Sequence, residues 1–303
     1  MQHTDKQVDW ASFRAQFPIF DSKIYINSCS YGALSNSVQN AFQLYLDSRL
    51  QQGSDWENWV NENEALRGDF AELFAAAPSE IAITASASAG MNSVASALDF
   101  SGQRNKVIIT EMEFPTQSQI WFAQQQRGAK VVRVCAGQGK TLLQRLEEEI
   151  DETTLMVATT HVCYRNGEKL PIEAIRDLAR KNGAYILVDG YQAIGSMMLN
   201  LRELDVDFYV GGSLKYLLAT AGIAFLYANQ NVISKLTPSM TGWFAQDDIH
   251  AMDDTRYNPS RTASRFEAGT PPVPNIYASR AGLALLKSVG LLAIEQRIAK
   301  LTA

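Results

Sequence analysis

The chain has 303 residues, and its 27 Lys and Arg against 32 Asp and Glu give a formal net charge of −5. At roughly 150 residues per domain, this length allows about two domains or one large α/β domain. The mild acidity argues against nucleic-acid and anionic-membrane partners, and the 46% hydrophobic and 19% charged residues exclude a mainly disordered chain.

The N-terminal part is expected to be helical and to carry no targeting segment. Residues 1–24 begin with a polar and charged stretch where a secretory signal needs an apolar core. The segment 56–76 (WENWVNENEALRGDFAELFAA) has the spacing of an amphipathic helix. No run approaches the ~18 apolar residues that a membrane-spanning helix needs. We therefore expect a globular, cytoplasmic protein.

From residue 81 onward, strands and helices alternate. Seven short runs rich in β-branched residues predict strands, and most are continuously apolar, as in parallel sheets covered on both faces. Segments with helical spacing lie between or after them. The predicted fold is therefore α/β, a mostly parallel sheet covered by helices on both faces. The strands are expected at 81–84, 106–110, 130–134, 155–160, 185–189, 207–210 and 223–228, and the helices at 88–99, 115–127, 140–150, 171–182, 276–288 and 290–301.

Two charged residues follow strands of this sheet, where ligands of such folds bind. Asp189 ends the run YILVD, and a carboxylate there is desolvated, which is costly without a cation or donor beside it. Taken alone, it is better explained as a helix N-cap or a Mg²⁺ ligand. Lys215, in GGSLKYL, precedes an apolar stretch; a single lysine is more often a surface residue. Together they are the acid and the amine that a pyridoxal phosphate site needs.

A phosphate site is expected beside this pair. The segment 83–98 (ITASASAGMNSVASAL) runs from a strand through small residues into a helix, so Ala87 and Ser88 would present N–H groups at a helix N-terminus. A serine N-cap of a buried helix explains the same residues equally well. The segment 136–141 (AGQGKT) ends like a Walker A loop, but the first glycine of that motif would fall at Val134, so the match fails.

The order of the motifs resembles the class V aminotransferase family of fold-type I pyridoxal phosphate enzymes, which includes cysteine desulfurases, kynureninases and isopenicillin N epimerase-like proteins. The resemblance covers nearly the whole chain from about Tyr25. It rests on six segments in the family's order: TASASAGMN (84–92), EMEFPT (111–116), THVCYRNG (160–167), VDGYQAIG (188–195), GGSLKYL (211–217) and RFEAGTPPVPNI (265–276).

The resemblance implies a role for each matching residue around the cofactor ring. Lys215 would form the Schiff base with pyridoxal 5′-phosphate and later move the substrate's α-proton, and Asp189 would pair with the pyridinium nitrogen. Gln192 would contact the phenolic oxygen of the ring. Phe114 would stack on its face, which suits a flat, polarised ring. His161 also follows a strand, where a structural hydrogen bond is more usual than a general-base role.

The resemblance also implies a phosphate site shared between two subunits. Ala87, Ser88 and Ser213 would bind the phosphate from within one chain. Trp243 and Thr270 match positions that reach the phosphate from the neighbouring subunit, so a homodimer with shared active sites is expected.

Three segments are expected along the chain. Residues 1–24 form an N-terminal helical segment, 25–275 the pyridoxal-phosphate-binding large domain, and 276–303 the start of a C-terminal small domain that is missing or reduced. In the family, that domain supplies the arginine that holds the substrate carboxylate and, in desulfurases, the catalytic cysteine.

The expected function is that of a pyridoxal-phosphate-dependent transferase or lyase acting on an amino acid through Lys215, with Asp189 as the second catalytic residue. The alternative is a catalytically impaired scaffold that keeps the fold for interaction. A cysteine desulfurase is disfavoured because none of the three cysteines matches the motif of its catalytic cysteine. They are also too far apart for a CxxC pair, so no zinc site is indicated. The cysteines are Cys29, Cys135 and Cys163.

Overall fold

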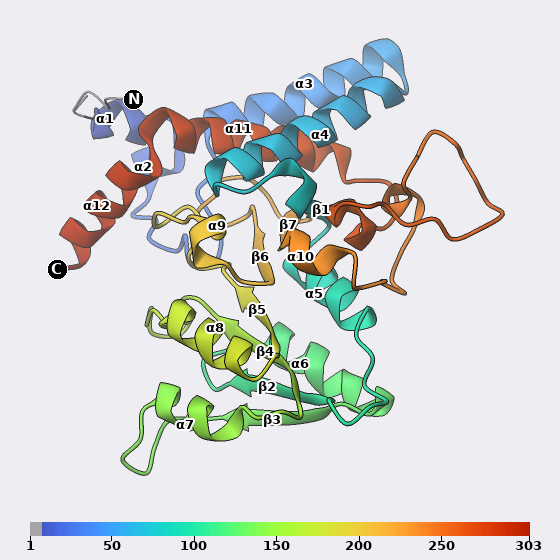
Figure 1. Cartoon of the computed structure of the whole chain (residues 1–303). Coiled ribbons are helices and arrows are strands. Elements are labelled where there is room, and N and C mark those ends of the chain that lie inside the picture. Colours follow the sequence, from blue (N-terminus) through green and yellow to red (C-terminus); the bar gives the residue numbers. More distant parts are fainter. Residues whose placement is uncertain (1–7) are drawn as a thin grey trace.

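A single seven-stranded sheet organises the protein, for which a computed structural model describes residues 8–303 (Figure 1). The strand order is β1-β7-β6-β5-β4-β2-β3, and all neighbours are parallel except β7, which is antiparallel to β1 and to β6. The strands are β1 (Ile81–Thr84), β2 (Lys106–Thr110), β3 (Lys130–Val134), β4 (Thr154–Thr160), β5 (Tyr185–Asp189), β6 (Phe208–Gly212) and β7 (Ala224–Ala228). The predicted fold class is confirmed, with strand ends displaced by at most two residues.

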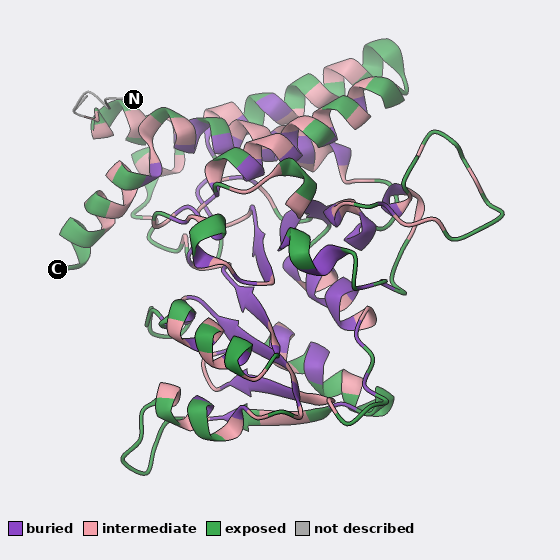
Figure 2. Ribbon diagram, in the orientation of Figure 1, coloured by how far each residue is buried: buried purple, intermediate pink, exposed green. Residues whose placement is uncertain are grey.

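Helices cover both faces of the sheet because successive strand residues point to opposite sides. On one face, Leu187 packs with the helices α5 (Ala87–Ser96) and α6 (Pro115–Ala123). On the other, Ile186 and Val188 pack with α4 (Trp56–Leu73), α7 (Leu142–Glu149) and α8 (Ile172–Lys181). Figure 2 shows the strands buried almost throughout, except for the edge strand β3, and the outer helix faces exposed. The continuous apolar runs of the sequence thus reflect burial on two sides.

Three long helices lie side by side beyond the β1 end of the sheet: α3 (Asn36–Gln52), α4 and α11 (Val273–Val289) (Figure 1). Asp69 of α4 joins two cations of α11, since its Oδ2 is 3.0 Å from Arg280 Nε and its Oδ1 is 2.9 Å from Lys287 Nζ. The expected division at residues 275/276 therefore falls inside a helix that packs on α3 and α4, and the domain assignment stays a prediction.

The remaining helices are short or peripheral. Within residues 8–24, α1 and α2 are helical, as expected, while residues 1–7 lie outside the described part. Across residues 8–303, no single helix is long and apolar enough to cross a membrane; only α11 and α12 pass such a test jointly, and they meet at an angle of 76°. These helices are α1 (Trp10–Arg14), α2 (Ile19–Ser22), α9 (Leu201–Leu204), α10 (Gln230–Ile233) and α12 (Leu291–Thr302).

The N-terminal segment 23–35 has no helix or strand, and it lies against the loop that carries Lys215. The backbone N–H of Gly32 donates to the carbonyl of Leu214 at 2.8 Å. A β-carbon on Gly32 would lie 2.2 Å from the carbonyl oxygen of Lys215, so only glycine permits this approach. The segment thereby forms one wall of the cavity described next.

Candidate active site

Six of the predicted site residues line one cavity of about 520 Å³ at the carboxyl ends of the parallel strands. They come from segments far apart in the chain, and a cavity of this size fits a small cofactor with a substrate. The N-terminal segment contributes Cys29 and Ser30 to the same wall. The six residues are Ala87, Ser88, Phe114, Asp189, Gln192 and Lys215.

Asp189 lies at the end of β5 and is 5% exposed. Its Oδ1 accepts the backbone N–H of Tyr191 at 2.9 Å. Burial raises the pKa of Asp189 to about 6, and the N–H of Tyr191 and the nearby Lys215 only partly offset this effect. A carboxylate held in this way is poised to receive a cationic ligand group, because such a group would relieve the cost of its desolvation.

Lys215 lies in the loop after β6 and is half-buried. Burial lowers the pKa of its amine, while Asp189 and Cys29 act in the opposite direction. Its Nζ is 4.7 Å from the ring centre of Tyr191 and 5.8 Å from that of Phe114. The amine thus faces aromatic rings, and a lowered pKa increases the unprotonated fraction that attacks a carbonyl carbon.

The first turn of α5 opens onto the cavity with free donors. Ser86 is the N-cap, since its hydroxyl accepts the N–H of Ala89 at 3.1 Å, so the helix begins at Ala87. Within residues 8–303, the N–H groups of Ala87 and Ser88 donate to no other group, and together with the helix dipole they favour an anion. Ser213 lies outside the cavity lining, yet its hydroxyl is fully buried and has no hydrogen-bond partner among those residues. Three unused donors of this kind suit a phosphate group.

Phe114 and Gln192 lie at the rim of the cavity. Phe114 precedes Pro115, which starts α6, and its ring is 45% exposed and perpendicular to the ring of Tyr164 at 5.0 Å. An exposed aromatic face beside the cavity is available for a flat ligand ring. Gln192 donates its side-chain Nε2–H to the carbonyl of Cys29 at 3.1 Å, so it also holds the N-terminal segment.

Trp243 and Thr270 do not line this cavity. The indole N–H of Trp243 donates to the carbonyl of Ile249 at 2.7 Å, and its ring packs against Trp56 at 5.4 Å. Thr270 is exposed in an irregular segment before α11. Within one chain, the structure therefore brings together the residues expected at the ring and at the first turn of α5. It leaves Ser213, Trp243 and Thr270 outside the cavity lining.

Glu113 is a buried carboxyl group beside the site that the sequence did not single out. Its oxygens accept hydrogen bonds from the Thr110 hydroxyl (2.6 Å), the Thr160 N–H (3.1 Å) and the Gln117 amide. Burial raises its pKa to about 8, and Asp189 adds to the shift. The sequence signal that could have singled out Glu113 is its position three residues after the strand β2, at the edge of the sheet where ligands bind.

The charged and polar groups of the cavity fit pyridoxal 5′-phosphate. The carboxyl of Asp189 matches a ring nitrogen that carries a proton, the amine of Lys215 matches an aldehyde, and the first turn of α5 matches a phosphate. The fold and the site thus define a pyridoxal phosphate enzyme of fold type I.

Comparison with known proteins identifies the family. Residues 43–303 match the class-V aminotransferase family. The uncharacterized aminotransferase YcbU of Bacillus subtilis (strain 168) is 33% identical over 298 residues, which cover 98% of this chain and 77% of that protein. A kynureninase of Bacillus mycoides (strain KBAB4) is 28% identical, over 98% of this chain and 73% of that protein.

The solved structure of the cystine C–S lyase C-DES in complex with cysteine persulfide has the same fold. It superimposes with a TM-score of 0.86 at 24% identity, covering 94% of this chain and 77% of that one. The chain belongs to the class V aminotransferase family and is an enzyme that uses pyridoxal 5′-phosphate. The expectations of family, fold, cofactor and enzyme class are confirmed.

Proposed function

We propose that the protein transforms an amino acid at the cavity between β5, the Lys215 loop and α5. The observation that carries this proposal is the placement of Lys215 and Asp189 in one cavity with the first turn of α5. When bound there, pyridoxal phosphate would supply an electron sink for a bond broken at the substrate's α-carbon. The catalytically impaired scaffold is not favoured, because both residues that the chemistry needs are present.

Each catalytic residue has a defined task in this proposal. Lys215 would hold the cofactor covalently through its Nζ and, once freed by the substrate, would take the α-proton at Nζ and return it. The lowered pKa of Lys215 supports attachment to the cofactor and removal of the α-proton, because both begin from the unprotonated amine. Asp189 holds the protonated ring nitrogen, and its burial makes the contact strong.

The cofactor is held by groups at three sides of the cavity. The phosphate would be bound by the N–H groups of Ala87 and Ser88 and by the hydroxyl of Ser213. Among residues 8–303, these three donors have no hydrogen-bond acceptor. Phe114 covers one face of the ring. Gln192 would contact the phenolic oxygen through its side-chain amide, which has a second N–H besides the one bonded to the Cys29 carbonyl.

The experiment is a spectroscopic titration of the purified protein. The wild type should carry a yellow chromophore that borohydride fixes to the peptide containing Lys215, as read by mass spectrometry. Lys215→Ala should lack the fixed cofactor, whereas Lys181→Ala, an exposed lysine of α8, should retain it. Asp189→Asn should keep the covalent link but lose turnover of every amino acid in the panel, because an unprotonated ring nitrogen is a poor electron sink. Full activity of Asp189→Asn would contradict the assignment.

We also propose that two copies of the chain complete each other's phosphate sites. Trp243 and Thr270 lie outside the cavity of their own chain, and Thr270 is exposed, so a partner chain is the remaining route to a phosphate. Diluting the dimer should then release cofactor, and Thr270→Ala should weaken cofactor binding while borohydride still labels Lys215. A monomer with full cofactor occupancy would refute the arrangement. The cytoplasmic location stays a prediction.

A further inference from the structure

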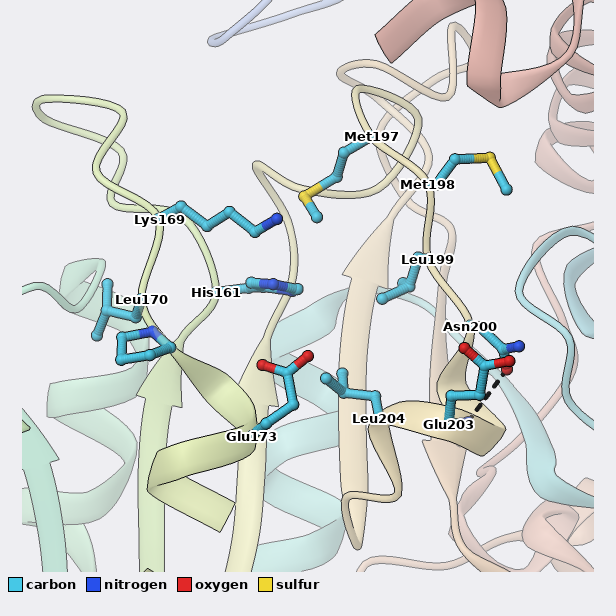
Figure 3. A pocket seen from close by; sticks show the side chains of 11 residues that line it. His161, Lys169, Leu170, Glu173, Met197, Met198, Leu199, Asn200, Glu203 and Leu204 are labelled. Atoms are coloured by element: carbon cyan, nitrogen blue, oxygen red, sulfur yellow. Dashed lines mark hydrogen bonds between the residues drawn. The ribbon is translucent and has the colours of Figure 1, made fainter. Parts of the chain in front are cut away.

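A second cavity of about 640 Å³ lies on the other side of the loops that follow β4 and β5, and it shares no lining residue with the active site. Figure 3 shows the side chains of His161, Lys169 and Glu173 gathered on one side of it, with Met197, Leu199 and Leu204 facing them. Asn200 and Glu203 also line the cavity, beside Leu204. The cavity therefore combines a polar side that carries both signs of charge with a side on which apolar groups lie next to Asn200 and Glu203.

His161 is the buried polar group of this cavity, at 4% exposure. Its Nδ1 is 2.9 Å from the hydroxyl of Tyr209. Burial raises the pKa of Tyr209 well above its ordinary value, so the hydroxyl keeps its proton. Nδ1 is the only hydrogen-bond partner of this hydroxyl among residues 8–303, and we assign the hydroxyl as the donor in this contact.

The assigned donor determines the tautomer of the imidazole. Burial, reinforced by Lys169, lowers the pKa of His161 to about 4, so the ring is neutral at physiological pH. With Nδ1 accepting, the proton of the neutral ring lies on Nε2. Nε2 makes no hydrogen bond within the described part of the chain, so it is a free donor at the cavity wall.

Two exposed charged residues, Lys169 and Glu173, lie beside His161. Across residues 8–303, neither Lys169 nor Glu173 forms an ion pair, although both are close enough to influence the pKa of His161. Lys169 and the Nε2–H of His161 together suit a carboxylate, and Glu173 suits an ammonium group. Leu199, Leu204 and Met197 offer an apolar contact surface.

We propose that this cavity binds a free α-amino acid with an apolar side chain, separately from the catalytic site. Its carboxylate is bound by Lys169 and His161, its ammonium group by Glu173, and its side chain lies against Leu199 and Leu204. The backbone N–H of His161 donates to the carbonyl of Asp189 at 2.8 Å, so a ligand at His161 lies one hydrogen bond from a residue of the catalytic cavity. The site therefore has a direct structural connection to the catalytic centre.

The test uses isotope-labelled histidine in the borohydride-treated holoenzyme, which cannot turn over. The chain has three histidines, so the His161 resonances are assigned by their loss in His161→Gln. We expect the free protein to show the Nε2–H tautomer, and added L-leucine to shift the His161 signals. Lys169→Met and Glu173→Gln should each weaken this response about tenfold, as expected for a lost charged contact. Lys181→Met, on the same helix as Glu173 but outside the cavity, should leave it unchanged.

Two analogues of leucine test the division of roles. The compounds 4-methylpentanoate and 3-methylbutylamine lack the ammonium and the carboxylate respectively, and each should bind at least about tenfold more weakly than leucine. An Nδ1–H tautomer, no response to leucine, an undiminished response in Lys169→Met, or equal binding of either analogue would each overturn the proposal. None of these outcomes depends on catalysis, so they are distinguishable from failure of the proposed function.

Discussion

Replacing Asp189 by asparagine should make the cofactor-free protein more stable at neutral pH while it impairs the cofactor site. Asparagine keeps the shape and an oxygen for the N–H of Tyr191 but carries no charge. Burial raises the pKa of Asp189 from 3.8 to about 6. At ~1.36 kcal/mol per pKa unit, the ionised carboxylate costs about 3 kcal/mol of folding free energy.

The sign of the pH dependence follows from linkage. The pKa of Asp189 is higher in the folded protein than in the unfolded chain, so ionisation of this carboxyl disfavours the folded state. Its contribution to the free energy of unfolding is fully present below about pH 3.8 and is lost as the pH rises towards about 6. The advantage of Asp189→Asn should therefore be about 3 kcal/mol at about pH 7.5 and only about 0.5 kcal/mol at about pH 4. Adding pyridoxal phosphate should stabilise the wild type more than the variant, because the wild type binds it more tightly.

Urea unfolding of the cofactor-free proteins at several pH values measures this difference directly. The matched control is Asp177→Asn, a carboxylate of α8 with its side chain 67% exposed, which should change stability little at any pH. A variant that is less stable than the wild type at about pH 7.5, or a difference that does not change with pH, would refute the reasoning.

Three further substitutions test the surroundings of the site. Burial raises the pKa of Glu113 to about 8, so the wild type should lose stability between about pH 4.5 and about pH 8. Glu113→Gln should flatten this part of the pH dependence measured by urea unfolding. An unchanged pH dependence would show that the carboxyl stays ionised. In Gly32→Ala, the added β-carbon would clash with the Lys215 carbonyl, so the variant should be less stable by about 1–3 kcal/mol and should bind the cofactor more weakly. Thermal unfolding with and without pyridoxal phosphate measures both effects. Phe114→Ala should weaken cofactor binding by about tenfold in a fluorescence titration with little loss of stability, since the ring is partly exposed; full affinity would remove Phe114 from the ring site.

The sequence predicted the sheet and the strand-end part of the site because both depend on local patterns. Apolar runs define the strands, and the rule that ligands bind at the carboxyl ends of parallel strands places Asp189 and Lys215 in one cavity. The N-terminal wall of that cavity was not predictable in the same way. Cys29 and Ser30 lie in a segment without periodicity, which is positioned by single hydrogen bonds from Gly32 and Gln192 to distant residues.

The buried polar groups show where sequence reasoning stops. Asp189 and Glu113 both follow apolar strands, and both have their pKa raised by burial. Their carboxyl groups differ in their contacts. Among residues 8–303, the Glu113 carboxyl accepts three hydrogen bonds, whereas the Asp189 carboxyl accepts one and faces a cavity. The unused acceptor capacity of Asp189 is therefore what separates a ligand-binding carboxylate from a structural one, and it exists only once the strands are assembled. The same criterion applies to His161, whose hydrogen bond to Tyr209 fulfils the expected structural role at Nδ1 and leaves Nε2 for a ligand.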